Sequence, residues 1–133
     1  MKILITVGTT SFNSLIKYLD ENLDKNTDVL FQIAKGEYIP KHFKYIEFTQ
    51  DINILYDEAD LIITHAGAGT IYKLLNLNKK ILMVPNLERV DNHQIEIAEY
   101  MGTNNHAIYC KSFNEIIESI GNIKDLKFFP FLF

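Results

Sequence analysis

The chain lacks several features that mark large classes of protein. Cys110 is its only cysteine, which excludes a disulfide framework and a thiolate metal cluster and fits a reducing compartment. The N-terminal apolar run, Ile3 to Val7, is too short for the core of a signal peptide. No run approaches the roughly 20 apolar residues of a membrane span. We therefore expect a soluble, cytoplasmic protein.

Clustered positive charge is also missing. The formal net charge is −4, and no run of lysine or arginine occurs. A nucleic-acid groove needs clustered cationic side chains to neutralise phosphates. Nucleic acid is therefore not an expected partner.

What the chain does have is enough apolar sequence for one compact domain. It has 133 residues, of which 47% are hydrophobic, and short apolar runs alternate with amphipathic segments. Apolar runs without polar alternation indicate strands buried on both faces, and strand–helix alternation indicates a parallel sheet. The predicted fold class is α/β, a three-layer Rossmann-like domain with a mostly parallel sheet of about six strands. Strands are expected at 2–7, 29–34, 45–48, 61–64, 80–85 and 106–110, and helices at 14–23, 52–59, 70–77, 92–101 and 113–120.

The last residues form a separate apolar tail. The predicted domain covers residues 1–122, and the tail covers 123–133, where four phenylalanines surround Pro130. Proline breaks helices, so the tail is expected to be extended. Two interpretations remain open. The tail is either a strap over the domain's own core, or an apolar peptide that docks on a partner subunit or at a membrane surface.

Ligands of parallel α/β sheets bind outside the carboxyl ends of the strands, and three polar loops follow predicted strands here. "HAGAGT" (65–70) lies between a strand and a helix. A helix N-terminus favours anions, Gly67 and Gly69 permit close approach of a phosphate, and His65 and Thr70 add donors. The alternative is a tight turn in which Thr70 caps the helix.

The loop "GTTSF" (8–12) is a weaker candidate. With one glycine it fits neither the dinucleotide fingerprint nor the P-loop. Thr9, Thr10 or Ser11 can cap the following helix, or the same hydroxyls can face a ligand.

The loop "NLERVDNHQ" (86–94) is dense in hydrogen-bonding groups, as sugar recognition requires. Asp91 and Gln94 also have the spacing of a capping box, which is the structural alternative. His93 and Glu96 lie three residues apart but have no accompanying metal ligands, so no metal is expected. His42, His106 and Cys110 read as surface, strand-end or packed residues. No nucleophile–base pair is evident. The polar cluster consists of Asn86, Asp91, Asn92, His93, Gln94 and Glu96.

Together, "VGTTSF", "HAGAGT" and "VPN" followed by "DNHQ" resemble the C-terminal, donor-binding domain of family-28-type glycosyltransferases with the GT-B fold. The resemblance covers roughly residues 2 to 120. It is strongest to two small stand-alone versions. One is the cytosolic subunit of the two-chain UDP-N-acetylglucosamine transferase of dolichol-linked oligosaccharide synthesis. The other is the short subunit of paired bacterial exopolysaccharide glycosyltransferases, which "FQIAKGEYIP" (31–40) also fits.

The resemblance implies roles for individual residues. The backbone of Gly67 to Thr70 would hold the donor diphosphate, the 92–94 segment would approach the donor sugar, and the 8–12 loop would face the acceptor half. The catalytic residue is not identified, and His65 and His93 are only candidates. The implied substrate-binding residues are Gly8, Thr9, Thr10, Phe12, His65, Gly67, Ala68, Gly69, Thr70, Lys73, Asn86, Asp91, Asn92, His93 and Gln94.

The implied reaction moves a sugar from a UDP-sugar to a lipid-diphosphate-linked acceptor. No bound metal or cofactor is implied, in agreement with the lack of an Asp-x-Asp motif. The acceptor half would be a separate, membrane-associated subunit that recruits this chain to the cytoplasmic face of the membrane. The missing base would lie on that subunit or between the two subunits. The family usually has glutamate at the position of Lys73, where a carboxylate accepts hydrogen bonds from ribose. Lysine only donates, so a non-catalytic nucleotide-sugar-binding or scaffolding subunit is the alternative.

Overall fold

The computed structural model describes residues 1–88 and 92–132, without the side chain of Asn92. By its internal contacts the chain divides into two compact units, Met1–Ile63 and Thr64–Phe133. Hydrogen bonding orders the strands as β3-β2-β1-β4-β5-β6 in one sheet. The predicted α/β class with six strands and five helices is confirmed for the described residues, in the predicted order along the chain.

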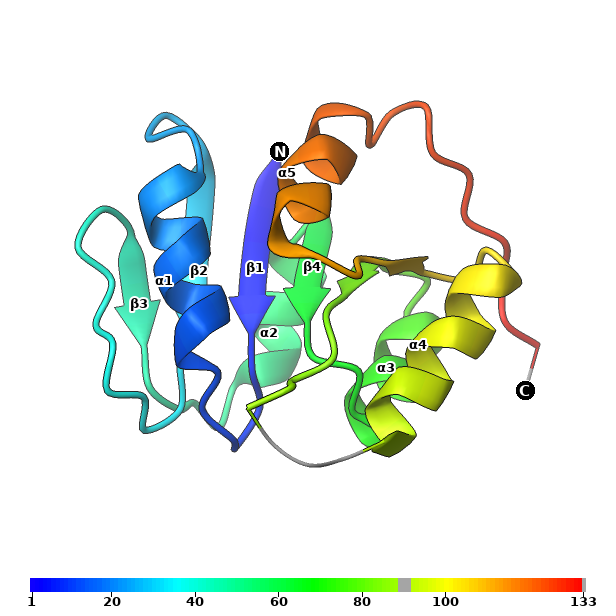
Figure 1. The fold of residues 1–133 in the computed structure, drawn as a ribbon, viewed down its shortest axis with the longest axis horizontal. Coiled ribbons are helices and arrows are strands. Elements are labelled where there is room, and N and C mark those ends of the chain that lie inside the picture. The colour runs from blue at the N-terminus through cyan, green and yellow to red at the C-terminus, as the bar shows by residue number, and fades with distance from the viewer. Residues whose placement is uncertain (89–91, 133) are drawn as a thin grey trace. The chain divides into compact units, whose positions relative to one another are not determined.

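The first unit begins with strands that pair in parallel. Ile3 lies opposite Val29 and Ile5 opposite Phe31, and Phe31 lies opposite Tyr45 on the next strand. A helix connects the first of these strands to the second, whereas residues 33–43 connect the second strand to the third without a helix (Figure 1). The elements are β1 (Lys2–Thr6), α1 (Asn13–Asn22), β2 (Asp28–Gln32), β3 (Lys44–Ile46), α2 (Ile52–Glu58) and β4 (Leu61–Thr64), whose last residue belongs to the second unit.

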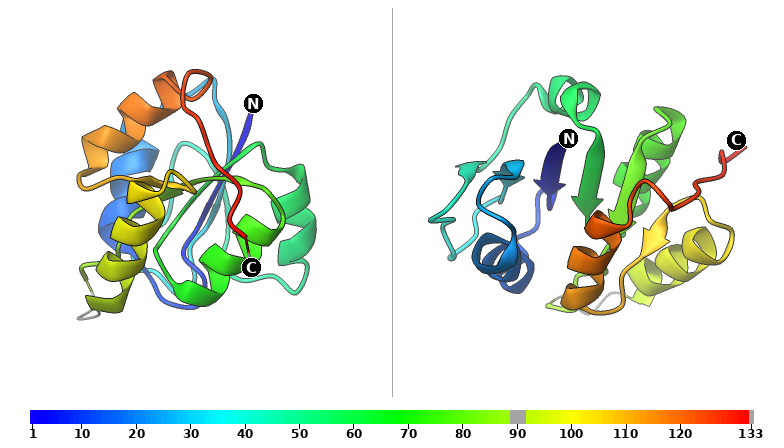
Figure 2. Two further views of the ribbon diagram at one scale, coloured as in Figure 1. Left: turned by 90° about the vertical axis from the view of Figure 1, so that its right-hand side faces the viewer. Right: turned by 90° about the horizontal axis from the view of Figure 1, so that it is seen from above.

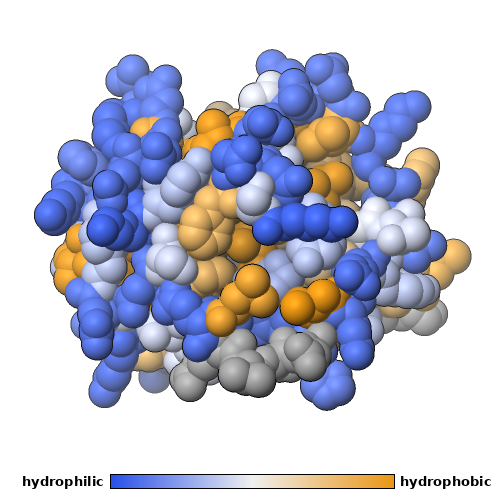
Figure 3. All heavy atoms as spheres, viewed as in Figure 1, coloured by the Kyte–Doolittle hydropathy of each residue, from blue (hydrophilic) through white to orange (hydrophobic). Residues whose placement is uncertain are grey.

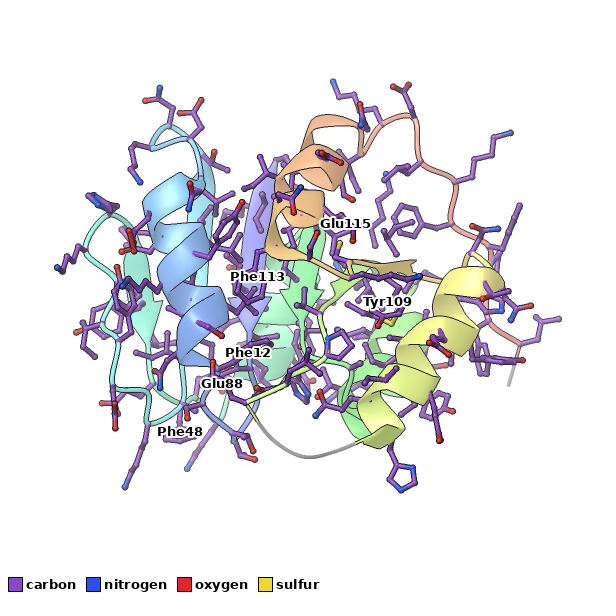
Figure 4. The ribbon with its side chains drawn as sticks, in the orientation of Figure 1. Phe12, Phe48, Glu88, Tyr109, Phe113 and Glu115 are labelled. Atoms are coloured by element: carbon purple, nitrogen blue, oxygen red, sulfur yellow. The ribbon has the colours of Figure 1, made fainter. Side chains whose placement is uncertain are left out.

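The second unit holds the remaining elements. Leu82 lies opposite Ile108 in a parallel pair, and the N–H of Val84 donates to the carbonyl of Thr64 at 2.8 Å. In Figure 4, Glu115 lies at the start of α5. Its carboxylate caps this helix by accepting the N–H of Ser112 at 3.1 Å. The elements are α3 (Ala68–Asn76), β5 (Lys80–Met83), α4 (Asn92–Thr103), β6 (Ile108–Tyr109) and α5 (Phe113–Gly121).

The strands form the core, as their unbroken apolar sequence predicts. Leu61, Ile62 and Ile63 of β4 are fully buried, and so is Ile81 of β5. A strand buried on successive residues is covered on both faces, which is the usual state of parallel strands. Polar side chains that gather at the carboxyl ends of these strands are therefore held on a rigid support.

Two helices begin at residues other than those predicted. The N-cap of α3 is Gly67, so Thr70 is the third helical residue and the interpretation of Thr70 as a cap is wrong. The helix starts early because the N–H of Gly67 donates to the His65 ring, which closes the turn before Thr70. The N-cap of α1 is Phe12 without a side-chain bond, so capping of this helix by Thr9, Thr10 or Ser11 is also wrong.

Strand β6 is shorter than the predicted 106–110 for a local reason. The N–H groups of His106 and Ala107 both donate to the carbonyl of Met101 and so close the end of α4. Asn105 takes a left-handed conformation with φ of 58° at this turn. Donors used in a helix end are not available to a strand ladder, so the pairing with β5 begins at Ile108. After Tyr109, the N–H of Cys110 still donates to the carbonyl of Met83 at 2.9 Å.

The tail is extended, as the proline predicts, and lies against its own unit. Residues 126–132 are neither helix nor strand. The N–H of Phe129 donates to the carbonyl of Asn105 at 2.8 Å, and the ring of Phe131 lies 5.7 Å from that of Tyr72 on α3. Figure 2 (left) shows the tail crossing the surface of the second unit. The division of the chain at residue 122 stays a prediction.

Candidate functional site

The N-terminus of α3 is built on a short turn between two residues. Nδ1 of His65 accepts the N–H of Gly67 at 3.0 Å. A Cβ atom at position 67 would overlap Cε1 of that ring and lie 2.8 Å from Nδ1. A side chain at 67 would therefore force the imidazole to move, a constraint that the sequence pattern alone did not reveal.

Three backbone donors at this helix end have no helical partner. The first helical bond joins the N–H of Ile71 to the carbonyl of Gly67 at 3.0 Å, which leaves the N–H groups of Ala68, Gly69 and Thr70. The N-cap contributes no side-chain hydrogen bond. A Cβ built on Gly69 would meet nothing within 4 Å, so the space beside the Cα of this residue is open. Such a helix end can accept an anion through its backbone and its dipole.

His65 is suited to donate a hydrogen bond here as a neutral ring. Burial lowers its pKa below the ordinary value, because a charged imidazolium would lose solvation. With Nδ1 occupied as the acceptor for Gly67, the proton of the neutral ring lies on Nε2. The Nε2–H group is then a donor beside the same helix end. It is not set up as a general base, since its basic nitrogen already accepts a hydrogen bond.

The loop after β5 brings two of the predicted residues together. Asn86 is buried, and its N–H donates to Oε1 of Gln94 at 2.8 Å. Oδ1 of Asn86 accepts the N–H of Glu88 at 3.1 Å, which shapes the loop as an Asx-type turn. Asn86 and Gln94 therefore fix the loop to the first turn of α4, and the amide group of Gln94 keeps donors for a ligand.

Other predicted residues of this loop lie differently. The side chain of His93 is 87% exposed, with Nδ1 3.6 Å from a carboxylate oxygen of Glu96. It projects into solvent at the start of α4. Asp91, and with it the suggested capping box, lies outside the described residues, as does the side chain of Asn92.

Lys73 is exposed on α3, one turn after Thr70. It belongs to the same helix as the three free N–H groups, but it lies toward the other end of that helix.

In the first unit, the loop after β1 depends on a residue that the site prediction omitted. Gln32 is 3% exposed, and its Oε1 accepts from the hydroxyl of Thr6 at 2.5 Å and from the N–H of Gly8 at 3.0 Å. Its Nε2 donates to the carbonyl of Gly8 at 2.8 Å and to that of Glu47 at 2.7 Å. One buried amide thus ties the end of β1 to the segment after β3. The signal for it was a polar residue inside the apolar run "VLFQIA".

Gly8 has a left-handed backbone conformation with φ of 70°, which residues with a side chain rarely adopt. Beside it lies a pocket of about 180 Å³, and Phe48, labelled in Figure 4, is 49% exposed at its rim. Phe12 does not offer a surface here, because its ring is only 3% exposed. The pocket is lined by Thr6, Gly8, Thr9, Gln32, Phe48, Thr49, Ile52 and Tyr56.

A second buried polar residue, Asp20, holds the segment after β2. Its carboxylate accepts the Tyr38 hydroxyl at 2.6 Å and the N–H groups of Lys41 and His42 at 2.9 and 3.0 Å. Burial alone would raise the pKa of Asp20, but these hydrogen bonds outweigh it and lower the pKa below 3.8. The same bond raises the pKa of Tyr38 to about 12. Asp20 therefore fixes residues 38–42 to α1 through three hydrogen bonds.

Neither a metal cluster nor a spanning helix is found in the part of the chain that the structure describes. Among the described residues, no three His, Cys, Asp or Glu side chains are grouped as a cation would need. None of the helices there combines the length and the apolar content to cross a bilayer.

The sequence as a whole was then compared with known proteins. Residues 2–125 match the profile described as the glycosyltransferase family 28 C-terminal domain. The chain belongs to this family. Family 28 proteins include relatives of very different length. The UDP-N-acetylglucosamine transferase subunit ALG13 of Homo sapiens is 35% identical over 123 residues, which cover 81% of this chain and 11% of the human protein. The protein of that name from Yarrowia lipolytica is 31% identical over 144 residues, covering 96% and 71% respectively.

A second kind of family 28 relative is a longer bacterial enzyme. The UDP-N-acetylglucosamine–N-acetylmuramyl-(pentapeptide) pyrophosphoryl-undecaprenol N-acetylglucosamine transferase of Prochlorococcus marinus (strain MIT 9312) is 29% identical over 142 residues, which cover 94% of this chain and 39% of the enzyme. Among solved structures, the NMR structure of ALG13 aligns with a TM-score of 0.69 at 20% identity, over 99% of this chain and 89% of that one. MurG of Acinetobacter baumannii aligns with a TM-score of 0.68 at 23% identity, over 94% and 42%. These structures confirm the Rossmann-like fold of a GT-B C-terminal half.

Proposed function

We propose that this chain is the donor-binding, catalytic subunit of a two-chain glycosyltransferase. It would move a sugar from a UDP-sugar to a lipid-diphosphate-linked acceptor in polysaccharide or glycan synthesis. The observation that carries the proposal is the set of three partnerless N–H groups on Ala68, Gly69 and Thr70, beside the open space at Gly69.

The donor diphosphate would be bound by these backbone groups. Its oxygens accept the N–H groups of α3, and the positive end of the helix dipole stabilises the negative charge that grows as the sugar leaves. Such stabilisation needs no metal. The Nε2–H of His65 is a further donor to the diphosphate or to the sugar, and the lowered pKa keeps that ring neutral.

The sugar itself would contact the first turn of α4. Gln94 is positioned by its bond to the N–H of Asn86, and hydroxyl groups of a hexose need directional amide donors and acceptors of this kind. Asn92 and His93 precede Gln94 in the same segment. In the first unit, the pocket beside Gly8 and Thr9 would be a separate candidate surface for substrate.

A partner subunit is proposed because the described residues do not supply a general base. They include no evident nucleophile–base pair, and His65 is occupied at its basic nitrogen. The human relative is called a transferase subunit, and the Prochlorococcus relative acts on a pyrophosphoryl-undecaprenol acceptor. By analogy, the base and the acceptor site would lie on a membrane-associated subunit, which would bring this chain to the cytoplasmic face of the membrane.

A second candidate function rests on Lys73. A lysine on α3 donates hydrogen bonds and cannot accept them from ribose hydroxyls, unlike the glutamate common in the family. The chain would then be a nucleotide-sugar-binding or scaffolding subunit without catalytic activity.

Sugar transfer from labelled UDP-sugars to a lipid-diphosphate acceptor distinguishes the two candidates. The assay compares the chain alone, a membrane fraction holding the acceptor-binding subunit alone, and the two together. The proposal expects transfer only in the mixture, with loss of transfer in Gly69→Ala. Transfer by the partner alone at the same rate would support the scaffolding role.

A further inference from the structure

A surface of the second unit combines exposed apolar side chains with lysines, and the donor-site proposal does not use it. Phe129 is 53% exposed and Leu132 is 89% exposed at the end of the tail. Tyr72 of α3, 40% exposed, lies beneath the tail through its contact with Phe131. In Figure 3, hydrophobic side chains appear at the right-hand edge, where Figure 1 shows the tail ending, and hydrophilic side chains surround them.

The tail is held so that these side chains face outward. The N–H of Phe129 donates to the carbonyl of Asn105 at 2.8 Å, and Nδ1 of His106 lies 2.9 Å from the carbonyl oxygen of Phe129. The ring of Phe131 packs inward, 5.2 Å from the imidazole of His106 in an edge arrangement. Because Phe131 anchors the segment, its neighbours Phe129 and Leu132 are left on the outside.

Lysines lie around this apolar surface. Lys79 and Lys80 line a pocket of about 260 Å³ together with residues 128–131 of the tail. Lys127 precedes that segment directly, and Lys124 lies near its start. Residues 64–80 and 124–133 together contain five lysines and one aspartate, in a chain whose formal net charge is −4. Positive charge is therefore concentrated on this part of an otherwise acidic protein.

We propose that this surface, formed by Tyr72, Lys79, Lys80, Lys127, Phe129 and Leu132, binds directly to an anionic phospholipid bilayer. An apolar segment inserts shallowly at the headgroup level, and nearby lysines are attracted to anionic lipid. Either signal alone gives weak binding, whereas the two together give stable attachment. The surrounding lysines, which complement the charge of anionic headgroups, favour lipid over an apolar protein groove as the occupant.

The proposed surface lies within the same unit as the candidate donor site. Helix α3 has nine residues, a length of about 13 Å. The free N–H groups lie at its start, and Lys79 and Lys80 follow its end. Contact with a bilayer would thus hold the diphosphate site within a short distance of lipid headgroups. This inference goes beyond the proposed function, and the vesicle assays that test it use neither nucleotide nor partner.

Co-sedimentation of the full chain with phosphatidylcholine vesicles, with and without phosphatidylglycerol, tests the proposal. Binding is expected only with phosphatidylglycerol and is expected to weaken with salt. Lys79→Glu/Lys80→Glu should reduce binding on the order of tenfold or more, since each juxtamembrane lysine contributes about 1 kcal/mol. The matched control, Lys17→Glu/Lys44→Glu, makes the same charge change on exposed residues of the first unit and should bind as the wild type.

The apolar contribution has a direct optical readout, because the chain contains no tryptophan. Leu132→Trp is expected to give a blue-shifted emission on anionic vesicles, as an indole that enters the interface does. Ile54→Trp places the probe at a side chain that is 56% exposed in the first unit, and its emission should not shift. Both variants alter exposed side chains, so circular dichroism should show them folded.

Three results would overturn the proposal. Equal binding to neutral and anionic vesicles would remove the role of the lysines. If the wild type does not bind vesicles, and Phe129→Ser/Leu132→Ser no longer binds a purified partner subunit, the surface is a protein interface. A concentration-dependent dimer that the same double variant abolishes would make a second copy the occupant.

Discussion

The N–H of Gly67 lies 3.0 Å from Nδ1 of His65, and this single hydrogen bond determines how α3 begins. It closes the turn after β4, leaves the next three N–H groups without a partner, and assigns the proton of the neutral imidazole to Nε2. A ring that packs on residue 67 also explains why that residue has no side chain. The candidate diphosphate site therefore depends on two residues that precede the helix.

Gly69→Ala separates ligand binding from stability. The added methyl group meets no atom of the protein within 4 Å, and alanine is a better helix former than glycine. The free energy of unfolding should stay the same or rise by up to about 1 kcal/mol. A methyl group in the space meant for a phosphate should cost about 1–3 kcal/mol of binding, a roughly fivefold to hundredfold loss of UDP affinity. Urea denaturation and isothermal calorimetry measure the two quantities.

The matched comparison is Gly67→Ala, whose methyl group overlaps the His65 ring. This variant should lose both stability and UDP affinity, because the ring must move and its bond to the backbone breaks. If Gly69→Ala binds UDP as the wild type does, the ligand does not occupy the space beside α3.

His65 should make stability depend on pH near neutrality. Burial lowers the pKa of the folded ring below 6.5, so the unfolded chain binds a proton first as the pH falls. The folded state is therefore destabilised as the pH drops below about 6.5. Above that pH the full stability is present. Urea titrations between pH 7 and pH 5 should show this loss, in a range above the acidic titration of Asp20.

His65→Asn is the control for this prediction. An asparagine carbonyl can accept the N–H two residues ahead, as in an Asx-turn, but does not titrate. The variant should keep the turn and show a smaller fall in stability between pH 7 and pH 5. An identical pH dependence in both proteins would show that another group is responsible.

Gln32 should be essential to the loop after β1. Gln32→Leu leaves the carbonyls of Gly8 and Glu47 without their buried donor and should cost about 3 kcal/mol of stability. In Gln32→Glu the carboxylate faces the same two carbonyls, so protonation should be favoured in the folded state. The stability of this variant relative to the wild type should rise as the pH falls toward 5. A constant difference across that range would contradict the hydrogen-bond assignment.

Lys73→Glu tests the position where the resemblance to family 28 glycosyltransferases implies a glutamate. A carboxylate repels phosphate, so tighter UDP binding could come only from a new bond to ribose, worth about 1–3 kcal/mol when charge-assisted. We expect such tightening by calorimetry, with no gain in Lys73→Gln. If both substitutions weaken UDP binding instead, the natural lysine contacts the diphosphate.

Much of the fold was predictable because the core strands are uniformly apolar. The runs at Leu61–Thr64 and Lys80–Met83 have the boundaries or nearly the boundaries that the sequence predicted, and the buried strands are those with no polar alternation. The helix beginnings were less predictable. They depend on side chains that precede the helix, such as His65, whose bond to Gly67 replaces the threonine cap that the pattern suggested.

The sequence indicated which loops follow strands and so where a site could lie, but not which side chains hold those loops in place. The glycines at 67 and 69 were found by their spacing, although the structure gives them different reasons, close approach at one and open space at the other. Gln32 and Asp20 were not found, because a buried polar residue is recognised by its partners, which lie about 15 to 25 residues away along the chain. Pairing of that kind is not visible in a single sequence.

The central claim is that the start of α3 binds the diphosphate of a UDP-sugar, and backbone amide shifts test it most directly. UDP, UDP-GlcNAc and UDP-galactose are titrated into the isotope-labelled chain, with uridine as the control without phosphate. The account predicts that the amide signals of Ala68, Gly69 and Thr70 shift with each diphosphate, saturate, and stay in place with uridine. Unmoved signals at these three residues, in a folded protein at saturating UDP-sugar, would contradict it.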